Sequence, residues 1–124
     1  MLDFISKHKT LPEVLMDQKL AALGDAYVNL LFSLALSKKR GEPVGARVNN
    51  NLLAVALRKA GLRELLPSRT NRHERANAAE ALIVYAWIRN AMTIKEAISI
   101  LEREEDLTEG FCALILVAKE KLNL

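Results

Sequence analysis

The stretch Leu20–Leu36, which reads LAALGDAYVNLLFSLAL, constrains the fold more than any other part of the chain. Its only polar side chains are Asp25, Asn29 and Ser33, spaced four apart, so they form one narrow stripe on an otherwise apolar helix. Such a helix belongs in the middle of a helical bundle. Asp25 then needs a partner, a metal ion or a wet cleft, unless the stripe faces solvent, because burying an unpaired carboxylate is costly. Gly24 is about 1 kcal/mol less favourable than Ala in a helix, which predicts close packing at this point.

Helix start and stop signals divide the remaining sequence. The 124 residues include only three prolines and five glycines, and no segment alternates with the period of a strand. Capping residues and terminating glycines place the helix boundaries. They predict helices at Leu11–Met16, Gln18–Lys39, Val48–Ala60, a short turn at Leu62–Leu66, His73–Ala91, Thr93–Glu104, and from Asp106 to the C-terminus. The sequence therefore predicts a single all-α domain over residues 1–124, with about six to seven helices.

Cysteine content and hydropathy bear on the cellular compartment. Cys112 is the only cysteine, so no internal disulfide can form, and it is expected to fill the core. Residues 1–10 are too polar for a secretion signal. The longest apolar run, Leu30–Leu36, is interrupted by Ser33 and is too short to span a bilayer. We therefore expect a cytoplasmic protein that has no membrane partner.

Positive charge is concentrated in the middle of the chain. Between Lys38 and Arg75 there are ten basic and three acidic residues, so this segment carries +7 and the rest −4 of the total +3. Such an asymmetry is compatible with a polyanionic partner. A solvated charged surface explains the same composition, and charge alone favours that simpler interpretation.

Three segments, in order, resemble the catalytic domain of the ribonuclease III family. Leu20–Ala26 (LAALGDA) resembles its signature helix, in which acidic residues precede a Leu-Gly-Asp-Ala core. Val48–Ala56, followed by Gly61-Leu62, resembles the family's next helix. Ala76–Ile83 (ANAAEALI) resembles the family's second acidic helix. A basic loop, Ser68–Arg75, lies where the family places its own. The resemblance covers about Leu11–Leu101, without a separate double-stranded-RNA-binding domain.

The resemblance implies a metal site built from two helices. Mg²⁺ or Mn²⁺ would be held by carboxylates and would activate water for phosphodiester hydrolysis. Asp25 and Glu80 match the family's acids and are the implied catalytic residues, with Asn77 as a third metal ligand through its carbonyl oxygen. Ala21, Asn77 and Gln18 stand where the family has other acids. Such a site should hold Mg²⁺ more weakly than four carboxylates would.

Further residues near these positions have two interpretations each. Gln18, His73 and Glu74 are possible auxiliary groups, although a loop position for His73 and a helix-start role for Glu74 explain them more simply. The same holds for Asp17, which can cap a helix. Arg69, Arg72 and Arg75 would contact RNA phosphates, or they could pair with the acids of segment 102–106. The aromatic residues Tyr27, Tyr85 and Trp87 are expected in the core or an interface.

Three functions are consistent with these patterns. The first, implied by the resemblance, is a homodimeric, metal-dependent endonuclease of double-stranded or structured RNA. The second is a catalytically impaired homodimer of the same fold that binds RNA without cutting it, which the missing carboxylates favour. The third is a helical protein-interaction module unrelated to RNA, against which the basic segment argues.

Overall fold

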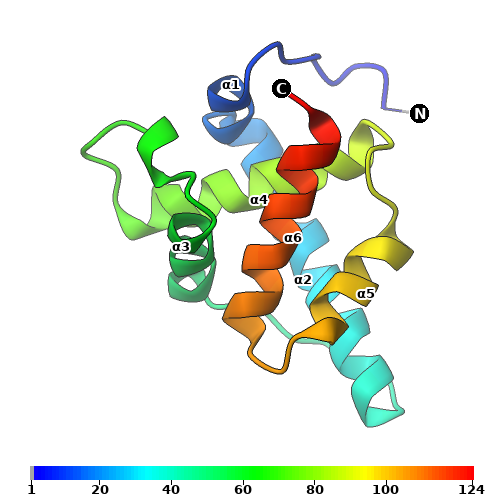
Figure 1. Cartoon of the computed structure of the whole chain (residues 1–124). Helices are drawn as coiled ribbons and strands as arrows, with labels where there is room; N and C mark the ends of the chain where they lie inside the picture. The colour runs from blue at the N-terminus through cyan, green and yellow to red at the C-terminus, as the bar shows by residue number, and fades with distance from the viewer. Residues whose placement is uncertain (1) are drawn as a thin grey trace.

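The computed structural model describes residues 2–124, which fold into six α-helices and one 3₁₀ helix without a strand (Figure 1). In chain order these are α1 (Leu11–Leu15), α2 (Gln18–Arg40), α3 (Asn50–Lys59), the 3₁₀ helix η1 (Arg63–Leu65), α4 (Arg72–Ile88), α5 (Ile94–Arg103) and α6 (Leu107–Leu122). The predicted all-α class is confirmed. The first two helices match their predicted bounds within a residue, while α3 starts two residues later and α4 ends three residues earlier than predicted.

The helix ends follow from local side-chain chemistry. Thr10 and Thr93 each form a reciprocal capping box with the glutamate three residues later. Asp17 caps α2 by accepting from the amides of Lys19 and Leu20, both at 3.0 Å. At the other end, Gly41 adopts a left-handed φ of 72°, which few residues other than glycine tolerate. The early end of α4 comes from Asn90, whose φ of 60° breaks the helix before Ala91.

The helix at the centre of the domain is α4, which corrects the prediction that the Leu20–Leu36 helix lies there. Helix α4 packs against α1, α2, α3 and α6, and in Figure 1 it crosses behind α6, starting on the side of α3. Almost every residue from Ala76 to Ala86 is buried. Five of these are alanines, so neighbouring helices can approach α4 from all sides.

Helix α2 is buried on only one side. Its inner face contacts α4, whereas Leu23, Leu30 and Leu34 on its outer face are 40%, 46% and 38% exposed. By length and composition α2 is also apolar enough to cross a membrane, contrary to the expectation from the length of its apolar runs. A helix from the core of a soluble protein passes the same test, and packing on α4 accounts for the apolar residues on the inner face of α2.

Close packing of α2 on α4 occurs at Gly24, as its position in the sequence predicts. A Cβ atom on Gly24 would lie 2.2 Å from the carbonyl oxygen of Glu80 and 2.5 Å from its carbonyl carbon. The two backbones therefore touch where Asp25 and Glu80 are located. The predicted core aromatics also lie in this region, with Tyr27 and Tyr85 buried and the Tyr27 and Trp87 rings stacked 5.0 Å apart. Cys112 is buried, as expected of a core residue.

Candidate active site

The two carboxylates singled out in the sequence meet where α2 crosses α4. Glu80 is only 3% exposed and is the only charged residue buried among residues 2–124. Its carboxyl is hydrogen-bonded to Asp25, whose side chain is 46% exposed. The pair therefore has one member inside the protein and one at the surface. Residues that are 55 positions apart in sequence converge because Gly24 brings the two helices into backbone contact.

The environment of Glu80 strongly favours its neutral form. Burial, the hydrogen bond to Asp25 and the negative charge of Asp25, in decreasing order of effect, together raise the pKa of Glu80 to about 8. The positive charge of Arg47 has a smaller, opposite effect. At neutral pH the carboxyl of Glu80 therefore keeps its proton, unless another cation takes its place.

Arg47 reaches this pair from an extended segment that lies along α2. Its Nη2 lies 3.4 Å from Oδ2 of Asp25. Nδ2 of Asn29 donates to the other oxygen, Oδ1, also at 3.4 Å. Arg47 is 78% exposed, so its guanidinium can also contact a ligand that approaches from solvent.

The segment 44–48, which we call the strap, is fixed to α2 by a row of polar side chains. Asn29 accepts from the amide of Val48 at 2.7 Å. Ser33 accepts from the amide of Ala46 and donates to its carbonyl oxygen, at 2.9 and 3.1 Å. Ser37 makes the same pair of bonds with Val44, at 2.8 and 3.1 Å. Beyond Asp25, the polar stripe on α2 is therefore covered by the strap, and it positions Arg47.

The other positions that correspond to family acids differ in how they lie relative to the Asp25–Glu80 pair. Asn77 is half-buried and lies one turn before Glu80 on α4. The position of the missing family acid on α2 is taken by Ala21, which is 4% exposed. Gln18 is exposed at the start of α2. Among residues 2–124, no group of three or more His, Cys, Asp or Glu side chains is close enough to hold a metal ion.

The auxiliary residues have structural contacts of their own. Glu74 is in a capping box with Asn71 at the start of α4. His73 is exposed, and its Nδ1 lies 3.4 Å from Nδ2 of Asn50. Besides capping α2, Asp17 lies 2.8 Å from Nε2 of His8. This contact, unlike the cap, had no signal in the sequence.

Comparison with models of known protein families shows which family this chain belongs to. A model described as ribonuclease III matches residues 18–120, which is most of the chain. The chain belongs to the ribonuclease III family. No curated protein matches the sequence at a significant level. Members of the family generally use a divalent metal ion and act on RNA, so the family supports a ribonuclease-like function in general.

Within this ribonuclease III domain, the predicted basic loop borders the start of α4. Arg69 and Arg72 are exposed, and Arg75 is half-buried. Nη1 of Arg75 donates to the carbonyl oxygen of Thr70 at 3.0 Å. In the described part of the chain none of these three arginines is in an ion pair. Of the acids from 102 to 106 that could have neutralised them, Glu102 pairs with Lys38 instead.

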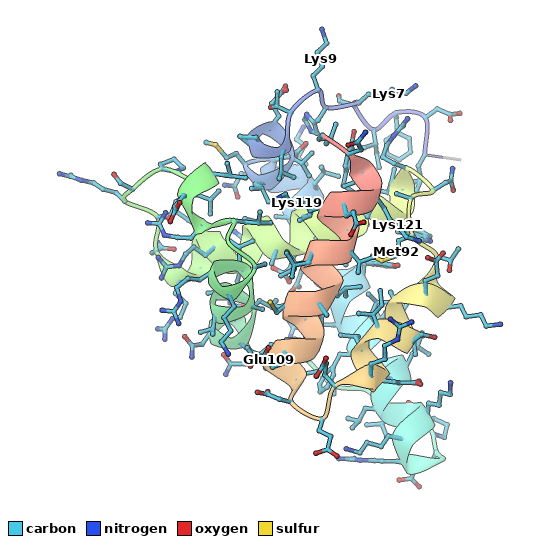
Figure 2. All side chains as sticks on the ribbon, in the orientation of Figure 1. Lys7, Lys9, Met92, Glu109, Lys119 and Lys121 are labelled. Carbon is cyan, nitrogen blue, oxygen red and sulfur yellow. The ribbon has the colours of Figure 1, made fainter. Side chains whose placement is uncertain are left out.

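Other ion pairs lie away from this loop and connect helices. Lys59 at the end of α3 pairs with Glu109 at the start of α6, which is labelled in Figure 2. Lys121, near the C-terminal end of α6, pairs with Glu96 of α5. Both pairs are partly exposed and belong to helix packing rather than to the Asp25–Glu80 site.

Proposed function

We propose that this ribonuclease III domain is a metal-dependent endonuclease of double-stranded or structured RNA, with Asp25 and Glu80 as its catalytic carboxylates. The observation that carries the proposal is the buried carboxyl of Glu80 held against Asp25. Such a pair opposes its own ionisation, so a structural role alone gives no reason for it. Strongly perturbed carboxyl groups are typical of functional sites.

The donors at this site suit one divalent ion rather than two. Mg²⁺ is commonly bound through one or two carboxylates, with the rest of its shell from water and substrate phosphate. Asp25 and Glu80 would supply the two carboxylates, and Asn77 a carbonyl oxygen. A bound divalent ion would activate water and neutralise charge on the leaving oxygen. The chain's own residues orient the site: Gly24 sets the helix spacing and the strap holds Arg47 beside Asp25.

Duplex RNA is the substrate class that the charge distribution supports. Arg69, Arg72 and Arg75 carry a net positive charge that no acid in residues 2–124 neutralises by an ion pair. Guanidinium groups bind phosphates through paired donors, and duplex RNA is recognised by shape through its backbone and 2′-hydroxyls. Sequence-independent binding of this kind should weaken steeply as salt increases.

A homodimer is supported by the outer face of α2. Leu23, Leu30 and Leu34 form an apolar stripe there, together with the exposed Ala22 and Ala26. A contiguous apolar stripe on a surface helix usually marks an interface. Analytical ultracentrifugation should give a dimer for the native chain and a monomer for Leu30→Glu. If that variant were still a dimer, or if the native chain were a monomer, the stripe would not be a dimer interface.

We also propose a cytoplasmic location, in keeping with RNA as substrate.

Cleavage of duplex RNA tests the proposed activity. The purified chain with Mg²⁺ or Mn²⁺ should cut a labelled duplex, and Asp25→Asn should abolish cutting while leaving RNA binding in place. Asp106→Asn is the matched control, because asparagine caps a helix as well as aspartate does. Continued cutting by Asp25→Asn would exclude the role assigned to this carboxylate.

RNA binding without cutting is the alternative, and the absence of a third acidic ligand in residues 2–124 favours it. In that case, Ala21→Glu combined with Asn77→Asp should create cleavage in a protein that binds RNA but is inert. Circular dichroism must accompany this test, because Ala21 is buried. Failure of both proteins to bind RNA would contradict the cutting and the binding proposals alike, and would favour a protein-interaction module.

A further inference from the structure

A small pocket lined by three arginines lies between α3, η1 and the first turn of α4. Its volume is about 190 Å³, and its lining residues are Asn51, Ala54, Val55, Arg58, Arg63 and Arg75. None of these six is acidic. Apart from Arg75, none of them was a candidate in the sequence or belongs to the Asp25–Glu80 pair.

Helix α3 forms one wall of the pocket with a single face. Residues 51, 54, 55 and 58 follow the spacing that places side chains on one side of a helix. Ala54 is buried and small, so it leaves a hollow below Arg58. The side chain of Arg58 is exposed and makes no hydrogen bond or ion pair within residues 2–124. Its five N–H donors are therefore available to a ligand.

The opposite wall is formed by two arginines that are already held in place. Arg63 donates from Nη1 to the carbonyl oxygen of Pro67 at 3.2 Å and from Nη2 to that of Ser68 at 2.9 Å. Arg75 donates to Thr70 at 3.0 Å. Each of these bonds uses only part of a guanidinium group, so both side chains retain free donors while their positions are fixed. The same bonds tie the Pro67–Thr70 loop to η1 and α4.

Three guanidinium groups around one hollow repel one another, and an anion among them would remove that repulsion. The carbonyl oxygens of the loop offset only part of the charge. Arginine suits phosphate in particular, because its planar donors match two phosphate oxygens at once. The lack of an acidic lining residue disfavours a cation or a basic peptide as the ligand.

We propose that this pocket binds one phosphate group of the RNA backbone through Arg58, Arg63 and Arg75. The inference rests on the proposed function for its source of phosphate. Arg75 and Glu80 are five residues apart on α4, or about 7.5 Å along the helix axis. The pocket and the Asp25–Glu80 pair are therefore less than two turns apart along α4, while five residues turn the helix by about 140°, so Arg75 and Glu80 point to different sides of it.

Two measurements on the full chain test this assignment. The first is duplex-RNA affinity by fluorescence anisotropy across a salt series, for the native protein, Arg58→Ala and the control Arg40→Ala. Arg40 is an exposed arginine at the far end of α2, so the control removes the same charge elsewhere. Arg58→Ala should weaken binding roughly tenfold, as expected for one charge-assisted contact, and lower the salt slope by about one. Arg40→Ala should change neither by as much.

The second measurement is an amide NMR titration with inorganic phosphate. The signals of Asn51, Ala54 and Val55 should shift in the native protein and stay in place in Arg58→Ala. Arg58 and Arg40 variants that bind RNA equally well would overturn the pocket while leaving the proposed function intact. Phosphate shifts in a protein that binds no RNA would instead overturn RNA as the source of the phosphate, and the proposed function with it. Circular dichroism of Arg58→Ala must match the native spectrum, which its exposed position leads us to expect.

Discussion

Replacing Glu80 by glutamine should stabilise the protein, and by an amount that depends on pH. The folded-state pKa of Glu80 is raised to about 8 from an ordinary value of 4.5. The stability that the protonated carboxyl provides is complete below pH 4.5. It is lost as the pH rises toward 8, because the unfolded chain releases the proton and the folded chain keeps it. Glutamine has nearly the same shape as the protonated carboxyl but does not titrate.

The size of the effect follows from the shift. At pH 7 the Glu80 carboxyl of the unfolded chain is about 2.5 pH units above its pKa, so it is ionised, whereas in the folded chain it is still mostly protonated. This difference lowers the free energy of unfolding by about 3 kcal/mol relative to a side chain that does not titrate. Asp25 is half-exposed, and water around it weakens its contribution to the pKa shift of Glu80. We therefore expect Glu80→Gln to raise the free energy of unfolding by roughly 1–3 kcal/mol. For a domain of this length each kcal/mol raises the melting temperature by roughly 3–6 °C.

Thermal unfolding followed by circular dichroism in EDTA measures this difference. The melting temperature of Glu80→Gln should exceed that of the native protein by roughly 3–18 °C at pH 7.5, and the difference should shrink toward zero at pH 4.5. Glu120→Gln removes an exposed carboxylate on α6 and serves as the control. A difference that stays constant with pH, or a Glu80→Gln variant that is less stable at pH 7.5, would refute the reasoning.

Three further predictions follow from the same region. Gly24→Ala should lower the free energy of unfolding by about 2 kcal/mol or more in urea titrations, because the added Cβ meets the backbone of Glu80 at 2.2 Å; Gly110→Ala, whose nearest contact is 3.3 Å, should cost less, and equal losses would contradict this. Ser33→Ala should cost about 1–2 kcal/mol and speed hydrogen exchange at the amide of Ala46 while sparing distant amides; unchanged exchange there would mean that Ser33 does not hold the strap. Calorimetric Mn²⁺ binding should release about one proton per ion at pH 6.5 and tighten as the pH approaches 8, because the ion displaces the proton on Glu80; an affinity that does not change with pH would exclude Glu80 as a ligand.

The fold could be predicted from the sequence because its determinants are local. Capping boxes, terminating glycines and helical periodicity act within a few residues, and they gave nearly all helix ends. The exception at the end of α4 came from the left-handed Asn90, a conformation that glycine adopts more readily. The choice of central helix was harder, because it depends on which helix can be enclosed. Alanine-rich α4 can be surrounded, whereas large leucines on both sides of α2 leave one face exposed.

The site was predictable only in part. Gly24, Asp25 and Glu80 were identifiable from the sequence, and their meeting depends on the close approach that Gly24 permits. Arg47 could not be found in this way, since its place beside Asp25 comes from the strap bonded to Asn29 and Ser33. The regular spacing of polar residues on α2 was visible and continues to Ser37, but it did not reveal that a chain segment occupies it. Arg58 and Arg63 were equally hidden, because neither lies within a motif.

The arrangement of charges suggests how binding and catalysis could be coupled at this site. Without a divalent ion, the negative charge at this site is limited by the proton on Glu80 and by the guanidinium of Arg47. An arriving phosphate would compete with Asp25 for the guanidinium of Arg47, which is exposed enough to turn toward it. When Arg47 turns to the phosphate, Asp25 has no cation beside it, and the affinity of the Asp25–Glu80 pair for a divalent ion rises. RNA and metal ion should therefore bind more tightly together than either does alone. Arg47→Ala should weaken this cooperativity, measured as the Mn²⁺ affinity with and without RNA. If RNA had the same effect on Mn²⁺ affinity in both proteins, Arg47 would have no part in the coupling.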